Sequence, residues 1–158
     1  MIGRALIYQD APSRLTEAVR ATLVWAALSF VLNLVWEIAQ LPLYTIPSAR
    51  SATQVAYAVA HCTAGDAAIA AVSFLIAAAA LGTARWPASH PRRGGAIIIL
   101  SGVSYTAYME WYSVYQAGYW TYSSSMPLVF DIGLSPLLQW ILIPIGTVLI
   151  VRTCHRAR

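Results

Sequence analysis

Residues 55–82 read VAYAVAHCTAGDAAIAAVSFLIAAAALG, and this stretch decides the fold of the chain. It contains no lysine or arginine, and Asp66 is its only acidic residue. A run of about 20 apolar residues is long enough to cross the roughly 30 Å hydrocarbon core of a bilayer. The sequence therefore predicts a membrane-spanning helix that carries a carboxyl group and an imidazole, that of His61, inside the bilayer.

Three further apolar segments of comparable length lie at about residues 22–46, 96–117 and 128–151. The chain of 158 residues is 59% hydrophobic and only 10% charged, whereas soluble domains carry about 25% charged residues. We therefore expect an all-α polytopic membrane protein, in which residues 1–158 form a single four-helix transmembrane domain. Helices that are neighbours in sequence should run antiparallel, because the loops between them are short.

The basic residues are concentrated on one side of these four segments. They are all arginines, and all but Arg50 lie before the first segment, between the second and the third, or after the fourth. Because loops rich in basic residues stay in the cytoplasm, we expect both termini to be cytoplasmic. The net charge of +4 is thus a signal of topology, and it predicts no nucleic-acid partner.

Four ionisable side chains interrupt the apolar segments, and three of them fall at one depth. At about 1.5 Å per residue, Glu37, His61 and Glu110 lie roughly 10–13 Å below the outer ends of their helices. Asp66 lies deeper, at about 18 Å. Ionisable groups inside a bilayer are costly and mark functional sites. We predict that the three shallower residues line one cavity open toward the outer side, and that all four are catalytic.

His61 and Asp66 are five residues apart, which places them about 140° apart around a helix. Both therefore should not point straight into one narrow cavity, and the sequence leaves open which of them faces it. Two carboxyl groups at one depth in a low dielectric are not both charged cheaply, so one should stay protonated near pH 7. We expect Glu37 to be the protonated one, because it adjoins Trp36 in the longest polar stripe.

Polar and aromatic side chains at helical spacing predict the groups that surround a substrate. Asn33 and Gln40 lie about one helical turn from Glu37 and share its stripe. The predicted substrate-binding residues are Asn33, Trp36, Gln40, Tyr57, Tyr108, Trp111, Ser135 and Gln139. The alternative for the polar members is adhesion between helices, at about 0.6 kcal/mol per hydrogen bond. The alternative for the tryptophans is ordinary packing.

A stripe of tyrosines follows the third segment on the side largely opposite Glu110. Tyr105 and Tyr108 lie too deep for the aromatic belt that gathers at membrane interfaces. Because a phenol hydroxyl needs a hydrogen-bond partner, we expect both to face protein.

The ends of the segments carry signals of their own. Asp10-Ala-Pro-Ser would open a short amphipathic helix that lies at the interface through Arg20. Asp131 would be the N-cap of the last helix. Pro136 and Pro144 predict kinks in that helix.

The histidine count limits the metal sites that the chain can build. Only three histidines are present, and His90 and His155 fall on the cytoplasmic side, so a cage of several histidines is excluded. The set Glu37, His61 and Glu110, with or without Asp66, has ligand types that suit a divalent ion and is an alternative use of the site. We predict no cofactor and no bound metal.

Three stretches resemble sequences of small bacterial inner-membrane proteins with four helices. They are Asn33-Leu-Val-Trp-Glu-Ile-Ala-Gln-Leu-Pro-Leu-Tyr, His61-Cys-Thr-Ala-Gly-Asp and Gly133-Leu-Ser-Pro-Leu-Leu-Gln-Trp. The resemblance implies the fold and a place in the bacterial inner membrane, and it carries no activity. In residue types and setting, the chain is also similar to the emopamil-binding sterol isomerases and the integral-membrane terpene cyclases. Those families protonate a carbon–carbon double bond with acids placed among tryptophans.

These features predict a membrane-embedded acid–base enzyme, of isomerase or cyclase type, whose substrate is an apolar isoprenoid or another membrane lipid. Glu37 and Glu110 would donate and accept the proton, and His61 would tune or relay it. One alternative is a small transporter, or a membrane protein that binds a cation or protons in the same layer. Another is a structural subunit of a larger complex, whose partner is a second copy or another membrane subunit.

Overall fold

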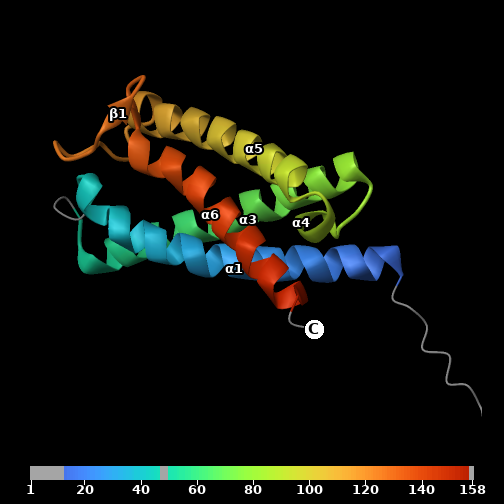
Figure 1. Ribbon diagram of the computed structural model, residues 1–158. Helices are drawn as coiled ribbons and strands as arrows, with labels where there is room; N and C mark the ends of the chain where they lie inside the picture. The colour runs from blue at the N-terminus through green and yellow to red at the C-terminus, as the bar shows by residue number, and fades with distance from the viewer. Residues whose placement is uncertain (1–12, 47–49, 157–158) are drawn as a thin grey trace, which may run out of the picture.

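The computed structural model describes residues 13–46 and 50–156, and these residues form an almost entirely helical bundle (Figure 1). The long helices are α1 (Arg14–Gln40), α3 (Ala52–Leu81), α5 (Pro91–Trp111) and α6 (Leu134–Arg156). The shorter elements are the 3-10 helix η1 (Leu41–Leu43), α4 (Trp86–Ser89), the π-helical turn η2 (Tyr112–Gln116), and a hairpin of β1 (Leu128–Val129) and β2 (Ile132–Gly133). The all-α class predicted from the sequence is confirmed.

In the described part of the chain, three stretches of helix are long and apolar enough to cross a membrane, namely Arg14–Leu43, Ala52–Leu81 and Leu134–Cys154. Helix α5 has 21 residues, a length of about 31 Å at 1.5 Å per residue. Its arginines, glycines, tyrosines and Glu110 lower its hydropathy, so it is not among the three. By length and composition, the chain is a helical membrane protein.

The helices run back and forth between two ends of the bundle (Figure 1). Helix α1 packs along α3, and α5 packs against both α3 and α6. The connections from α1 to α3 and from α5 to α6 lie at one end, which we name the hairpin end after β1 and β2. The start of α1, α4 and the last turns of α6 lie toward the other end, which we name the arginine end. Its arginines are Arg14, Arg20, Arg85, Arg92, Arg93 and Arg152.

Helix α1 begins where a cap is available, before the apolar residues start. The Ser13 hydroxyl accepts a hydrogen bond from Thr16 N at 3.2 Å, and the helix runs unbroken from Arg14. The separate interfacial helix predicted to end at Arg20 is therefore wrong for residues 14–20, which belong to α1. The residues predicted to open it, from Asp10 to Pro12, lie outside the described part of the chain.

A hairpin replaces the first turns of the helix predicted over 128–151, so α6 begins at Leu134. Phe130 and Asp131 form its turn with φ of 50° and 63°, a left-handed conformation that side chains other than glycine rarely adopt. Asp131 is thus a turn residue, and its prediction as a helix N-cap is wrong. Pro136 lies in the first turn of α6, where a proline interrupts no helical hydrogen bond, whereas Pro144 lies inside the helix.

The arginine end is closed by a packed aromatic core. Trp25, Phe74 and Trp86 are buried, with ring centroids 5.2–5.5 Å apart. Helix α4 supplies Trp86, whose ring lies directly against α5. A Cβ added at Gly94 would lie 1.9 Å from the Trp86 ring, so the two elements approach this closely only because residue 94 has no side chain.

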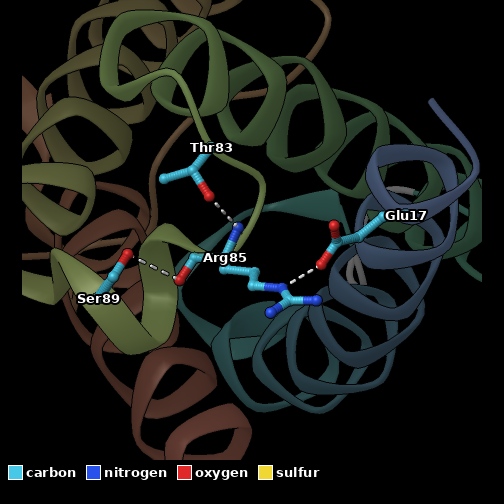
Figure 2. A network of polar contacts seen from close by, with 4 residues as sticks. All are labelled: Glu17, Thr83, Arg85 and Ser89. Carbon is cyan, nitrogen blue, oxygen red and sulfur yellow. Dashed lines mark hydrogen bonds and ion pairs between the residues drawn. The ribbon is translucent and has the colours of Figure 1, made fainter. Parts of the chain in front are cut away.

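An ion pair ties the start of α1 to the connection between α3 and α4 (Figure 2). The Arg85 guanidinium pairs with the Glu17 carboxylate. The Arg85 backbone is held by two neighbours, since its N–H donates to the Thr83 hydroxyl and its carbonyl oxygen accepts from the Ser89 hydroxyl, each at 3.1 Å. Because Arg85 is largely exposed, the pair contributes at most about 1 kcal/mol to stability.

Candidate functional site

A cavity of about 290 Å³ lies at the hairpin end, between α1, α3, α5 and α6. Glu37, His61, Asp66 and Glu110 all line it, so the structure brings together the four residues predicted as catalytic. Apolar and aromatic side chains make up much of the remaining wall, among them Leu41, Val59, Ile69, Met109, Trp120, Pro136 and Trp140. The sequence left open which of His61 and Asp66 faces the cavity; both line it, and Asp66 also accepts a hydrogen bond from Gln139 of the neighbouring helix α6.

The carboxyl groups of Glu37 and Asp66 share one amide donor. Gln139 Nε2 lies 2.8 Å from Asp66 Oδ2 and 3.3 Å from Glu37 Oε1. The same nitrogen lies 2.7 Å from Asn33 Oδ1. A side-chain amide has only two N–H bonds, so Gln139 satisfies two of these three acceptors at a time. Through this one side chain, α6 connects α1 to α3 in the middle of the bundle.

The carboxyl groups of Glu37 and Asp66 lie close together, since the same amide nitrogen is within hydrogen-bond distance of both. Two neighbouring carboxyl groups in a low dielectric are not both charged cheaply, so one of them should stay protonated. Gln40 Nε2 donates to Glu37 Oε1 at 2.9 Å, and the Ser135 hydroxyl donates to Gln40 Oε1 at 2.8 Å. The pair therefore lies inside a hydrogen-bond network that draws on three helices.

The third carboxyl group, that of Glu110, is held by two phenols. The Tyr122 hydroxyl donates to Oε2 at 2.7 Å, and the Tyr44 hydroxyl donates to Oε1 at 3.3 Å. Burial raises the pKa of both tyrosines, and the nearby Glu110 carboxylate raises it further, so both hydroxyls keep their protons. With each oxygen accepting a hydrogen bond, Glu110 has the pattern of an ionised carboxylate.

Tyr44 and Tyr122 belong to two connections that pair with each other at the hairpin end. Thr45 N donates to Thr121 O at 3.0 Å, and the two threonine hydroxyls are 2.8 Å apart. Ser123 N donates to Leu43 O at 2.9 Å. Sequence reasoning missed both tyrosines, because this pairing joins segments far apart in the chain. The only signal was the number of aromatic residues in the second connection.

The cavity opens between α3 and α5. His61, Gly65 and Tyr105 line it and are also exposed at the surface of the bundle. His61 stacks on Tyr57, with ring centroids 5.8 Å apart and an angle of 17° between the planes. His61 and Gly65 belong to α3 and Tyr105 belongs to α5, two helices that diverge toward the hairpin end (Figure 1). The exposure of these lining residues therefore places the opening on the flank of the bundle.

The polar residues predicted to bind a substrate divide into two groups. Gln40 and Gln139 line the cavity. Asn33 and Ser135 do not line it, and they hold these two amides in place by hydrogen bonds. Their role is therefore to support the wall of the cavity. This role is close to adhesion between helices, the alternative that the sequence gave for these polar residues.

The aromatic residues predicted to bind a substrate lie elsewhere. Trp36, Tyr57, Tyr108 and Trp111 do not line the cavity, and the last three are 71%, 58% and 44% exposed. Adjacent residues on a helix point about 100° apart, so a tryptophan next to a cavity-lining glutamate faces away from the cavity. The expectation that Tyr105 and Tyr108 face protein is therefore wrong for Tyr108, whereas Tyr105 lines the cavity. The tryptophans that line the cavity are Trp120 and Trp140.

Within the described ranges, no three histidine, cysteine, aspartate or glutamate side chains are placed to hold a metal ion together. The oxygens of Glu37 and Glu110 accept hydrogen bonds from amides and phenols instead. The arrangement suits the holding and transfer of protons.

Comparisons with protein-family models, with curated proteins and with solved structures found no match to this chain. The fold and the cavity define its class, a helical membrane protein with a buried site of carboxyl groups. Any more particular assignment has to come from the geometry of that site.

Proposed function

We propose that the protein is a membrane-embedded acid–base enzyme, of isomerase or cyclase type, that acts on an apolar isoprenoid or another membrane lipid. One observation carries the proposal. A single cavity contains two neighbouring carboxyl groups within reach of one amide, Glu37 and Asp66, and a separate carboxyl group, Glu110, that accepts hydrogen bonds at both oxygens. An acid and a base in different environments but in one cavity are what proton-transfer catalysis requires.

The reaction follows from these two environments. The carboxyl pair donates its proton to one carbon of a double bond, whose π electrons form the new C–H bond and leave a carbocation at the other carbon. Glu110 then removes a proton from a carbon next to the cation, and that C–H electron pair forms the new double bond. Return of the proton from Glu110 to the pair restores the enzyme, and the substrate is isomerised with no net gain of atoms.

The wall of the cavity supports an apolar substrate. Leu41, Ile69 and Met109 give it an apolar surface, and none of the arginines that the structure describes lines it. The rings of Trp120 and Trp140 lie in the same wall, where an aromatic face stabilises a developing positive charge. The flank opening between α3 and α5 would let a lipid enter from the bilayer without passing through water.

The topology is part of the proposal. We place all four long helices across the membrane, with α5 shielded by α3 and α6, against which it packs. The arginine end is then cytoplasmic by the positive-inside rule, as are both termini. The sequence resemblance supports the bacterial inner membrane as the location. The likeness to sterol isomerases and terpene cyclases supports the reaction class.

A deuterium test checks the function without knowledge of the substrate. The purified protein is incubated in D2O with the lipid extract of its host cells, and the lipids are analysed by mass spectrometry for deuterium bound to carbon. Wild-type protein should introduce deuterium into one lipid class, and Glu110→Gln should not. Asp131→Asn is the matched control, because it makes the same change of acid to amide in the exposed hairpin turn.

Two other functions use the same cavity and would appear as different outcomes. A transporter or proton-binding protein would leave lipid carbons unlabelled but would change the proton flux across proteoliposomes. A structural subunit would show neither effect, and Glu37→Gln would instead alter its assembly with a second copy or a partner subunit. Absence of deuterium on carbon with wild-type protein would overturn the enzyme proposal.

A further inference from the structure

We infer that Asp66 is the residue of the carboxyl pair that carries the proton, and that Gln40 is the positioning residue that places it there. The inference rests on the proposed acid–base function, since it names the acid of that reaction. It differs from the expectation drawn from the sequence, which gave the proton to Glu37.

The hydrogen bonds around the pair are unequal. Glu37 Oε1 has a donor of its own in Gln40, at 2.9 Å, and Gln139 lies at 3.3 Å. Asp66 has only Gln139, at 2.8 Å, whose two N–H bonds are shared with Asn33 and Glu37. Hydrogen bonds donated to a carboxylate favour its ionised form. Glu37 keeps its own donor however Gln139 is shared, so it is the partner that stays ionised, and Asp66 keeps the proton.

Gln40 is the source of this inequality, because Gln139 serves both carboxyl groups whereas Gln40 serves only Glu37. The orientation of the Gln40 amide is set from α6. The Ser135 hydroxyl donates to Gln40 Oε1 at 2.8 Å, which leaves the Gln40 NH₂ group facing Glu37. Gln40 is buried, so solvent does not compete for this donor.

The other titratable groups around the cavity do not reverse this order. Helix α5 contributes Tyr105 and Glu110, and the Glu110 oxygens accept hydrogen bonds from Tyr44 and Tyr122. Helix α3 contributes His61, at the opening, and Cys62. Helix α6 contributes the Gln139 amide, Pro136 and Trp140, none of which is an acid or a base. Three acids thus line one cavity, and no arginine among the described residues lines it with them, so leaving one acid neutral lowers the repulsion between them.

Infrared spectroscopy on the intact wild-type protein tests the assignment. A protonated carboxyl group has a C=O stretching band distinct from those of carboxylates and amides, and ¹³C in that group shifts the band. The chain has only six acidic residues, three aspartates and three glutamates, so two labelled samples suffice. We expect the band at neutral pH to shift in protein labelled with ¹³C-aspartate and to stay in place with ¹³C-glutamate. A shift with labelled glutamate, or no such band, would overturn the inference.

Variants then separate Asp66 from the other aspartates and test Gln40. Asp66→Asn should remove the band, and Asp131→Asn should leave it unchanged. Gln40→Leu removes the extra donor to Glu37, so part of the band should now shift with ¹³C-glutamate. The control is Gln116→Leu, at an exposed position of η2, which should give the wild-type spectrum. A Gln40→Leu spectrum identical to wild type would remove the positioning role.

The infrared measurement needs no substrate, so its failure is distinct from failure of the proposed function. An aspartate band together with no deuterium on lipid carbon would reject the enzyme and leave the proton on Asp66. Deuterium on lipid carbon together with a glutamate band would keep the enzyme and reject this inference.

Discussion

The arginine end and the hairpin end of the bundle are held together by different interactions. At the arginine end, Trp25, Phe74 and Trp86 pack ring against ring, and helix–helix approach is set by a glycine, Gly94. At the hairpin end, buried amides, phenols and carboxyl groups are joined by hydrogen bonds around a cavity. The arginine end is therefore sensitive to substitutions that change side-chain volume, and the hairpin end is sensitive to substitutions that remove hydrogen-bonding groups.

Within one small domain, the arginine end supplies packing and the hairpin end holds the groups that can carry out chemistry. A close-packed core has no space for a ligand, because interiors pack at the density of organic crystals. A cavity with three carboxyl groups is costly unless other packing holds the helices around it. The helices α1, α3, α5 and α6 extend from one end to the other, so the packed end can support the polar end.

The largest effect should come from removing the acid or the base at the hairpin end. Asp66→Asn or Glu110→Gln should each lower deuterium incorporation into lipid by at least about 10²-fold, since a positioned acid or base contributes about 10²–10⁴-fold. Both variants should fold, because an amide has nearly the shape of a carboxyl group. Asp131→Asn should keep wild-type incorporation, and if it also lost activity the assignment of the site would be wrong.

The next largest effect should come from adding one methyl group at the arginine end. Gly94→Ala places a Cβ 1.9 Å from the Trp86 ring. Overpacking of a core costs about 1–3 kcal/mol, so we expect the variant to be destabilised by that amount. Thermal unfolding in detergent measures the change. Gly95→Ala is the matched control, because nothing lies within 4 Å of that Cβ and alanine favours a helix over glycine. Equal melting temperatures for the two variants would contradict the packed interface.

A smaller effect separates the tryptophans that line the cavity from those that do not. Trp120→Leu should slow turnover by about 2- to 30-fold, which corresponds to the loss of a cation–π contribution of about 0.5–2 kcal/mol. Trp111→Leu, on the exposed face of α5, should leave the rate unchanged. The ratio of the two rates measures the effect, and a ratio of one would remove the rings from the mechanism.

The smallest effect should come from the exposed ion pair at the arginine end. Glu17→Gln should change the free energy of unfolding by less than about 1 kcal/mol and should leave turnover unchanged. The change should shrink further as salt is added, because ions screen exposed charges. Denaturation at two salt concentrations provides the measurement. A loss of activity would show that the two ends are coupled more strongly than the packing suggests.

Part of the site was predictable from single residues. An acid inside an apolar segment is visible in the sequence, and all four of the side chains predicted as catalytic line the cavity. Helical spacing also found Gln40 and Gln139. Adjacency in sequence was misleading for Trp36 and Trp111, because neighbours along a helix point in different directions.

The sequence by itself determined the class of protein and the residues that carry charge into its apolar interior. Both depend on the order of residues within one segment, since hydropathy and length are local properties of the chain. Only the tertiary structure decided that Tyr44 and Tyr122 hold Glu110, that Gln139 joins Glu37 to Asp66, and that the cavity opens between α3 and α5. Each of these depends on the rotation of a helix and on the pairing of loops distant in sequence, which are set by packing among all the helices at once.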